Sequence, residues 1–281
     1  MLDKKIIRQH FNDATESYDA VAVLQQEVAN RLSERLAYIK IDPKITLDMG
    51  CGTGFISKDL LQRYSKSKVV SLDSALNMTR KCLKQGGWFR KPSGVCADAE
   101  ALPIKPDTVD LIVSNLMLQW CNDLEKTFSG FHQVLAPNGL LLFSTLGPDT
   151  LKEVRQSWQS VDEEPHTSPF MDMHDIGDAL LKAGFIDPVT DMEVITMTYS
   201  GARQLMTDIK KTGANNAHSQ RTKGLTGKHK FAEFENNYQK FITDEGLFPA
   251  TWEIIYGHAW VGEGLKLDNY EKVIPIKEIR P

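Results

Sequence analysis

Three glycines at alternate positions after an acidic residue form the most informative stretch of the chain. Asp48 is followed by Gly50, Gly52 and Gly54 in the run Leu-Asp-Met-Gly-Cys-Gly-Thr-Gly. Glycine adopts positive φ without strain and lets a ligand approach the backbone closely. Nineteen residues after Gly54, Asp73 ends a second apolar run, where a carboxylate can accept hydrogen bonds from both hydroxyls of a ribose. Together these features predict a site for a nucleoside cofactor.

The surrounding residues indicate which elements hold this site. Residues 45–47 form an apolar run typical of a buried strand, and residues 55–64 have the amphipathic pattern of a helix, so the glycines would form a tight turn between the two. A second strand is predicted at 69–72. Further strands are expected at 94–97, 109–114 and 140–145, separated by helices that reach about residue 85 and span 124–135. This alternation favours an α/β fold with a doubly wound parallel sheet.

The remaining segments are expected to elaborate this core. Helices are predicted at 151–161 and 174–183, a strand at 189–199 and a closing strand at 251–261. We therefore expect an N-terminal helical segment (1–40), a core (41–200), a helical insertion (201–248), the closing strand of the core (249–262) and a tail (263–281).

The N-terminal segment has apolar or small side chains at helical spacing over residues 17–37. Phe11, Tyr18 and Gln25 are seven residues apart and would share one stripe if a single helix extended back to residue 11. Packing is the ordinary explanation for such a stripe. Gln25 is the unusual member, because an apolar face rarely carries an amide.

Composition is that of a soluble globular protein: 281 residues, 41% apolar and 25% charged. No apolar run approaches the roughly 18 residues that a membrane-spanning helix needs, and the N-terminus lacks the apolar core of a secretion signal. The four cysteines, Cys51, Cys82, Cys96 and Cys121, have no metal-type spacing. We expect no bound metal, no membrane and reduced thiols in a cytoplasmic protein.

The insertion is basic, although the chain as a whole is acidic. Residues 201–231 carry a net charge of +6, against −4 for the whole chain. Such a block suggests a docking surface for an acidic partner. A solvated surface without a partner is the alternative, and nucleic acid is less favoured because a net acidic chain binds phosphate weakly. The basic residues are Arg203, Lys210, Lys211, Arg221, Lys223, Lys228 and Lys230.

The Gly-x-Gly-x-Gly spacing differs from the Gly-x-Gly-x-x-Gly of dinucleotide-binding folds and resembles motif I of the S-adenosylmethionine-dependent methyltransferases. The resemblance implies a Rossmann-like, mostly parallel seven-stranded sheet with helices on both faces, an N-terminal helical lid over the cofactor mouth, and S-adenosylmethionine as cofactor. By resemblance, Asp98 would bond the adenine amino group, Ala99 would offer its backbone amide, and Asn115 would lie near the sulfonium. A turn-initiating role is the alternative for Asp98, and a glycine-rich turn without ligand is the alternative for the motif. The cofactor-binding residues predicted in this way are Asp48, Gly50, Cys51, Gly52, Gly54, Asp73, Ser74, Asp98, Ala99 and Asn115.

A narrower resemblance covers roughly residues 5 to 262. The runs that carry it are 11–19, 24–25, 47–54, 114–120 (Ser-Asn-Leu-Met-Leu-Gln-Trp), 143–147, 171–174 and 257–260 (Gly-His-Ala-Trp). They are similar to the malonyl-[acyl-carrier protein] O-methyltransferases of biotin synthesis. This family methylates the free carboxylate of a malonyl thioester, which masks its charge for the fatty-acid machinery. Similar methyltransferase cores occur in complex I assembly factors.

The implied chemistry needs no general base, because a carboxyl group is already ionised at neutral pH. Catalysis would come from aligning the carboxylate with the methyl group and excluding water. The candidates to contact the carboxylate are Tyr18, Arg221 and His258. Each has an ordinary alternative: packing for Tyr18, a partner surface for Arg221, and a core position for His258.

The acyl-carrier protein is the expected partner, because it is strongly acidic. Docking is assigned to Arg203, Lys210, Lys211 and Lys223. Two other functions remain open. One is a methyltransferase for another small carboxylic acid or a quinone precursor, and the other is a non-catalytic assembly factor that retains the cofactor pocket.

Overall fold

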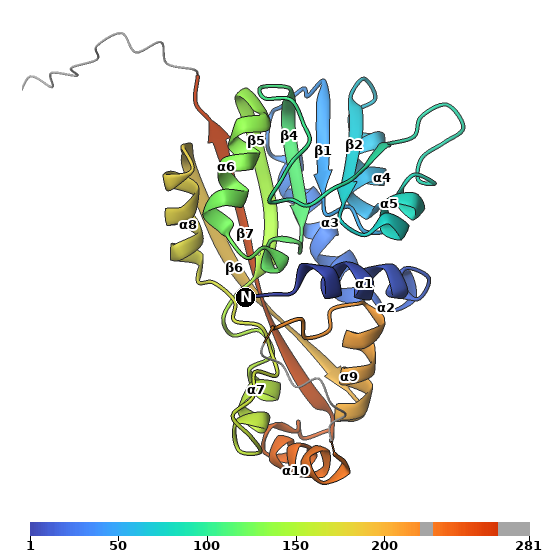
Figure 1. Ribbon diagram of the computed structural model, residues 1–281, viewed down its shortest axis with the longest axis vertical. Coiled ribbons are helices and arrows are strands. Elements are labelled where there is room, and N and C mark those ends of the chain that lie inside the picture. Colours follow the sequence, from blue (N-terminus) through green and yellow to red (C-terminus); the bar gives the residue numbers. More distant parts are fainter. Residues whose placement is uncertain (220–226, 264–281) are drawn as a thin grey trace, which may run out of the picture.

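The computed structural model describes residues 1–219 and 227–263. Its centre is a seven-stranded sheet in the order β3-β2-β1-β4-β5-β7-β6 (Figure 1). Neighbouring strands from β3 to β5 are parallel, and β7 is antiparallel to both β5 and β6. The strands are β1 (Ile45–Met49), β2 (Lys68–Asp73), β3 (Ser93–Cys96), β4 (Val109–Asn115), β5 (Leu135–Leu146), β6 (Phe185–Tyr199) and β7 (Phe248–Val261).

Helices cover both faces of this sheet. One face packs against α3 (Val23–Ala37) and α4 (Phe55–Arg63), and the other against α6 (Leu124–Val134) and α8 (Met173–Lys182). Strand β4 shows why the sequence builds a two-faced core. Leu111 and Val113 pack on the α3 side and Ile112 packs on the α6 side, and each is at most 1% exposed. Because successive side chains in a strand point to opposite faces, a continuous apolar run fits a sheet that is covered on both.

The long strands β6 and β7 carry a second group of helices. They extend beyond the ends of the other strands, and their far halves pair with each other from Val194 with Glu253 to Tyr199 with Phe248. Figure 1 shows α7 (Lys152–Gln159), α9 (Ala202–Lys211) and α10 (Lys228–Tyr238) gathered around this extension. The short helices η1 (Leu118–Trp120) and η2 (Gln239–Phe241) and the helix α5 (Leu76–Cys82) complete the described elements of the core and its extension.

The sequence-based prediction of the sheet is confirmed, with two strands longer than expected. Strand β5 begins at Leu135 because residue 135 pairs with Val109 ahead of the main register, and β6 begins at Phe185 because it pairs with Val261. Within the described residues, no helix is long and apolar enough to cross a membrane.

The N-terminal segment is not one continuous helix, so the condition for a shared stripe is not met. The segment divides into α1 (Lys4–Ala14), α2 (Tyr18–Val21) and α3, with a break at Ala22 (φ −78°, ψ 42°). Side-chain hydroxyls compete for the last carbonyls of α1: Thr15 Oγ1 donates to Phe11 O (2.9 Å) and Ser17 Oγ to Ala14 O (3.2 Å). Phe11, Tyr18 and Gln25 therefore lie in three helices instead of one stripe.

Gly257 in β7 allows close packing of β7 against β5. It pairs with Phe143 of β5, and a Cβ at position 257 would lie 2.3 Å from Phe143 Cζ. This contact gives a physical reason for the glycine in the Gly-His-Ala-Trp run. Gly130 in α6, in contrast, has no atom within 4 Å of its hypothetical Cβ.

We predict that Gly257→Ala lowers the free energy of unfolding by about 1–3 kcal/mol, because the fully buried Phe143 ring must move. The matched control Gly130→Ala should leave stability unchanged or raise it by up to about 1 kcal/mol, since alanine favours a helix interior. Urea denaturation measures both. Equal stabilities of the two variants would contradict the packing argument.

Candidate functional site

A cavity opens at the carboxyl ends of β1, β2 and β4, opposite α1. Its volume is about 720 Å³, including the part that is open to solvent. The cavity brings together seven of the ten predicted cofactor residues: Gly50, Gly52, Asp73, Ser74, Asp98, Ala99 and Asn115. The other lining residues are Lys4, Ile7, Arg8, Phe11, Tyr18, Leu72, Met78, Ala97, Leu116, Met117, Trp120 and Cys121. We refer to it as the first cavity.

The glycine turn has the conformation that its sequence predicts. Gly50, Gly52 and Gly54 have φ of 76°, 49° and 97°, a region that side-chain-bearing residues rarely adopt. A Cβ on Gly50 would lie 2.4 Å from Met117 Cγ, so this position needs glycine for packing. Gly52 has nothing within 4 Å of its hypothetical Cβ and lines the cavity. A ligand can therefore approach the backbone at Gly52.

Asp73 is fixed at the end of β2 by backbone amides. Its Oδ2 accepts from Gly52 N (3.0 Å) and its Oδ1 from Ala75 N (2.8 Å). Burial raises the pKa of this carboxyl, and the hydrogen bonds from Ala75, Gly52 and Ser74 oppose that rise. A carboxylate has about four lone-pair sites, and these three hydrogen bonds leave one of them for a ligand. The arrangement fits the predicted contact with a ribose diol.

Asp48 does not line the first cavity, so the structure does not support the prediction that it contacts the cofactor. Its side chain is buried and accepts from Ser57 Oγ (2.5 Å), which in turn lies 2.5 Å from Ser71 Oγ. Burial raises the Asp48 pKa well above its ordinary value. The residue joins β1, β2 and α4 beneath the glycine turn.

Cys51 and Gly54 also lie outside the lining. Cys51 is buried, and the hydrogen bond with Cys82 together with burial raises its thiol pKa well above the ordinary value. A Cβ on Gly54 would lie 2.6 Å from Gln85 Cγ and 2.9 Å from Cys82 Sγ. Gly54 therefore serves the packing of α4 against the segment that follows α5.

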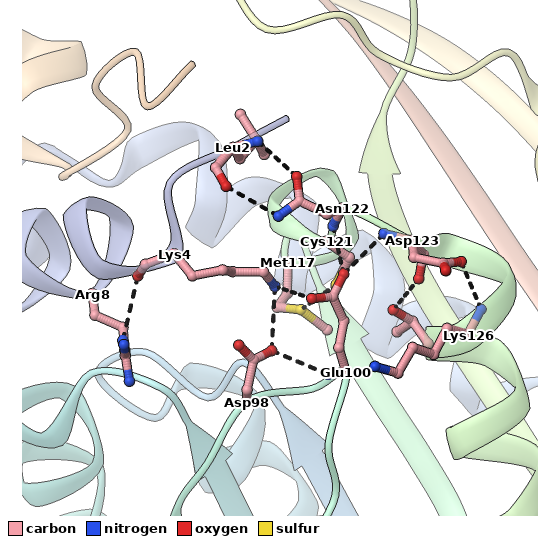
Figure 2. A network of polar contacts seen from close by, with 11 residues as sticks. Leu2, Lys4, Arg8, Asp98, Glu100, Met117, Cys121, Asn122, Asp123 and Lys126 are labelled. Atoms are coloured by element: carbon pink, nitrogen blue, oxygen red, sulfur yellow. Dashed lines mark hydrogen bonds and ion pairs between the residues drawn. The ribbon is translucent and has the colours of Figure 1, made fainter. Parts of the chain in front are cut away.

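The N-terminal segment is fastened over the first cavity by a polar network (Figure 2). Lys4 Nζ lies 3.2 Å from Asp98 Oδ1 and 2.9 Å from Glu100 Oε2. Leu2 exchanges two hydrogen bonds with the Asn122 side chain (2.6 and 3.1 Å). Burial alone would lower the Lys4 pKa, but the hydrogen bond to Glu100 and the charges nearby raise it. These contacts hold α1 against the loops that follow β3 and η1.

Asp98 combines the two roles that the sequence left open. Its Oδ1 accepts from Glu100 N (3.1 Å), which is the turn-initiating role, and also pairs with Lys4. For Oδ2, no contact exists with the described part of the chain, so this atom is available to a ligand amino group in the cavity. Ala99, 8% exposed, lines the cavity next to it.

Asn115 is held on both sides by the scaffold. Its Nδ2 donates to Gln25 O (3.0 Å) and its Oδ1 accepts from Ser144 Oγ (2.8 Å). It therefore links α3, β4 and β5 at the cavity wall. The part of Gln25 that takes part is the backbone carbonyl instead of the side-chain amide.

Aromatic residues from distant segments meet in the lining of the first cavity. Phe11 and Trp120 meet edge to face, with ring centroids 5.4 Å apart. Tyr18 lines the same cavity, and burial together with the charges of Asp73 and Asp19 raises its pKa, so the phenol stays protonated at neutral pH. Sequence reasoning gave no role to Lys4, Arg8 or Trp120. The sequence could have pointed to Trp120, because the run 114–120 that ends there is one of those that carry the narrower family resemblance.

A second cavity adjoins the first, and Trp120 lines both. Its volume is about 1180 Å³ including solvent-open space. It lies where η1, the end of β5, α7, α9, α10 and the start of β7 meet, and its walls are mainly apolar and aromatic. The lining residues are Gln119, Trp120, Leu146, Leu151, Val154, Trp158, His166, Thr167, Ser168, Phe170, Met206, Ile209, Ala214, Asn215, Asn216, Phe231 and Trp252.

The remaining predicted residues lie away from these cavities or outside the described chain. His258 is half-buried within β7, where it pairs with Leu142 and Val189, and it lines neither cavity. Burial lowers its pKa. The structure does not support a substrate contact for it. Arg221 and Lys223 lie outside the described residues.

The described docking candidates are exposed on α9. Lys210 and Lys211 form part of its last turn, and Arg203 lies near its start with its guanidinium 4.6 Å from the Phe231 ring centroid. No group of three or more His, Cys, Asp or Glu side chains suitable for a metal occurs in residues 1–219 and 227–263.

The comparisons with known proteins agree on one family. A family model described as a methyltransferase domain matches residues 47–143. The chain is 49% identical over 266 residues to a malonyl-[acyl-carrier protein] O-methyltransferase from Gallionella capsiferriformans, covering 92% of this chain and 91% of that protein. It is 39% identical over 274 residues to the protein of the same name from Legionella pneumophila, covering 97% and 96%.

Solved structures share the fold at low identity. The YcgJ protein of Bacillus subtilis superposes with a TM-score of 0.59 at 13% identity, covering 84% of this chain and all of that one. A phosphoethanolamine N-methyltransferase of Haemonchus contortus in complex with S-adenosyl-L-methionine gives 0.54 at 17%, covering 89% and 57%. The Rossmann-like α/β architecture predicted from the sequence is confirmed.

We predict that Lys4→Met loosens α1. The half-buried ion pairs with Asp98 and Glu100 should contribute about 1 kcal/mol, so amide hydrogen exchange over residues 4–14 should rise roughly fivefold. Lys5→Met is the matched control, because Lys5 is exposed on the same helix. Equal exchange in the two variants would mean that these ion pairs do not fasten the helix.

Proposed function

Because the chain belongs to the malonyl-[acyl-carrier protein] O-methyltransferase family, we propose that it esterifies the free carboxylate of a malonyl group on acyl-carrier protein, with S-adenosylmethionine as methyl donor. The chain is an S-adenosylmethionine-dependent methyltransferase by family and by fold. The methyl ester would mask the malonyl charge and allow the acyl group to enter pimeloyl synthesis for biotin.

One observation carries the proposal: a cavity with the donor and acceptor set of a nucleoside site opens next to an apolar cavity across Trp120. The residues of the first cavity fit the cofactor. Asp73 has a free acceptor site beside the bare backbone of Gly52, and Asp98 lines the same cavity. When bound, S-adenosylmethionine supplies a methyl group activated by its sulfonium. Asp73 would accept from the ribose hydroxyls and Asp98 from the adenine amino group.

The protein's contribution to the chemistry is alignment and exclusion of water. A malonyl carboxylate is ionised at neutral pH and is itself the nucleophile, so no residue needs to remove a proton. The carboxylate oxygen must be held in line with the methyl carbon at roughly 3–3.5 Å. Phe11 and Trp120 shield this position from solvent, and Tyr18 can donate one hydrogen bond to the carboxylate without neutralising it.

Transfer of a labelled methyl group tests the function. Incubation with labelled S-adenosylmethionine and malonyl-[acyl-carrier protein] should label the acyl group, and mild base should release the label as methanol. Labelling of other small carboxylic acids or quinone precursors, but not of the malonyl carrier, would favour the broader methyltransferase. Cofactor binding without any transfer would favour an assembly factor.

We predict that Tyr18→Phe lowers kcat/KM for malonyl-carrier protein by about tenfold or more, the loss of one hydrogen bond of about 1.5 kcal/mol to a charged acceptor. The melting temperature should change little. Tyr38→Phe is the control, because Tyr38 is 89% exposed and distant from the cavity lining. An unchanged rate in Tyr18→Phe would remove this residue from the substrate contacts.

We further propose that the exposed cations of α9 steer the acidic carrier protein towards the site. Lys210 and Lys211 are exposed at the end of α9, and Met206 and Ile209 of the same helix line the second cavity. A carrier docked there would present its pantetheine arm close to that cavity. Arg221 and Lys223 remain part of the proposal on sequence grounds alone.

We predict that reversing Lys210 and Lys211 together to Glu raises KM for malonyl-carrier protein by about tenfold at low salt, with the effect shrinking as salt screens the charges. A short malonyl thioester without the carrier should be used almost as well as before. The matched control reverses Lys66 and Lys68, which are exposed before and at the start of β2. Equal losses with both substrates would contradict a docking role.

A further inference from the structure

The second cavity offers a ligand no unbalanced charge. Its described lining contains no Lys, Arg, Asp or Glu, whereas the first cavity is lined by both cations and carboxylates. The imidazole of His166 lies 2.6 Å from Asp162 Oδ1, so a proton on this ring is balanced by that carboxylate. An ionised group that enters such a space loses its hydration without gaining a counter-ion, which is costly. The second cavity therefore fits the neutral portion of a substrate.

Aromatic rings give the second cavity a preformed apolar wall. Trp158 lies between His166 and Phe234, with ring centroids 3.9 and 4.5 Å apart and interplanar angles of 9° and 13°. Trp158 is 6% exposed, and Phe234 behind it is fully buried. Met206 and Ile209 of α9 line the same space. A carbon chain that enters the cavity thus meets a surface that needs little further ordering.

The segment 214–216 brings an unpaired carboxamide to the same cavity. Asn216 fastens this segment, because its Nδ2 donates to Pro165 O and its Oδ1 accepts from His218 N (2.9 Å). The neighbouring Asn215 lines the cavity and is half-buried, and its side chain makes no hydrogen bond within the described chain. A carboxamide carries both donors and an acceptor, so it can pair with a secondary amide of a ligand.

Position and size match the arm that would carry the acyl group. Trp120 lines both cavities, so a substrate whose carboxylate lies in the first cavity extends past this ring into the second. The second cavity, about 1180 Å³ with its solvent-open part, is far larger than a malonyl group. A pantetheine arm alternates short carbon chains with neutral amides. Exposed Lys210 and Lys211 directly follow Ile209 on α9, so cations lie beside this wall for the phosphate at the far end of the arm.

We propose that the second cavity binds the pantetheine arm of the malonyl thioester. The Asn215 carboxamide hydrogen-bonds an amide of the arm, and the aromatic wall packs against its carbon chain. The inference rests on the proposed function and adds to it a binding site for the arm and a specificity-determining residue. No covalent bond is made or broken at this site.

The first test compares two malonyl thioesters that differ only in the arm. Malonyl-pantetheine carries the amides, and the S-ethyl malonyl thioester carries none. Wild-type protein should favour malonyl-pantetheine by at least about tenfold in kcat/KM. Asn215→Leu keeps a similar side-chain volume but removes the carboxamide, so it should lower this preference about fivefold. Asn236→Leu is the matched control and should keep the preference, because Asn236 is exposed on α10 and lines neither cavity.

The second test measures binding without chemistry. In protein labelled with carbon-13 at the methionine methyl groups, the Met206 methyl should show nuclear Overhauser contacts with the geminal dimethyl group of S-methylpantetheine in the presence of adenosylhomocysteine. Met192 is the control methyl and should show none, because it is exposed on β6 and lines neither cavity.

The outcomes separate the inference from the function. If malonyl-carrier protein is methylated but Met206 shows no contact with the arm, the inference is overturned and the function stands. If the contacts appear but no malonyl thioester is methylated, the proposed function fails and the cavity remains a site for the arm. Equal slowing of both thioesters by Asn215→Leu, or an unchanged preference, would overturn the assigned contact of Asn215.

Discussion

The hydrogen bond from Gly52 N to Asp73 Oδ2 joins the two features on which the site depends. It connects the glycine turn after β1 to the end of β2, and it exists because parallel strands bring their carboxyl ends to one edge of the sheet. Leu72 O strengthens the same connection by accepting from Gly50 N (2.8 Å) and Cys51 N (3.0 Å). Without this connection, the carboxylate and the bare backbone would not face one cavity.

The rest of the molecule forms the walls of the two cavities beside that edge. Strands β6 and β7 extend past the parallel strands and support α7, α9 and α10, whose side chains wall the second cavity. Buried Glu153 and Glu253 order the start of β7 by accepting from backbone amides at Thr251 and Asp149. On the opposite side, Lys4 fastens α1 over the first cavity. A small charged acyl group can thus be enclosed while its carrier remains outside.

Local patterns in the sequence predicted most of the fold and half of the site. The alternation of apolar runs with helices predicted the parallel strands. A strand that is buried on both faces needs consecutive apolar residues, such as Leu111 and Ile112. The glycine spacing predicted the turn, since positive φ restricts residue choice. The prediction that Asp48 contacts the cofactor is not supported. An acid at a strand end gives the same sequence pattern whether its side chain faces a ligand or, as here, accepts a hydrogen bond from Ser57.

Long-range arrangement could not be read from the same patterns. The end of α1 at Ala14 involves the hydroxyls of Thr15 and Ser17, which compete for helix carbonyls, and the helical periodicity continues through it. Lys4 acquires its role only when segments distant in sequence meet, at Asp98 and Glu100. His258 illustrates the reverse: its place in the closing strand was predicted, but the distinctive run around it did not reveal that it lines neither cavity.

The proposed function requires that the first cavity binds the nucleoside part of the cofactor. Calorimetric titration of the intact, monodisperse protein with adenosylhomocysteine tests this most directly. We expect saturable binding of one molecule per chain, weakened by Asp73→Asn and not by Asp59→Asn, because the half-buried Asp59 of α4 lines neither cavity. Absence of binding to the folded protein, or equal binding by both variants, would contradict the assignment of the cavity.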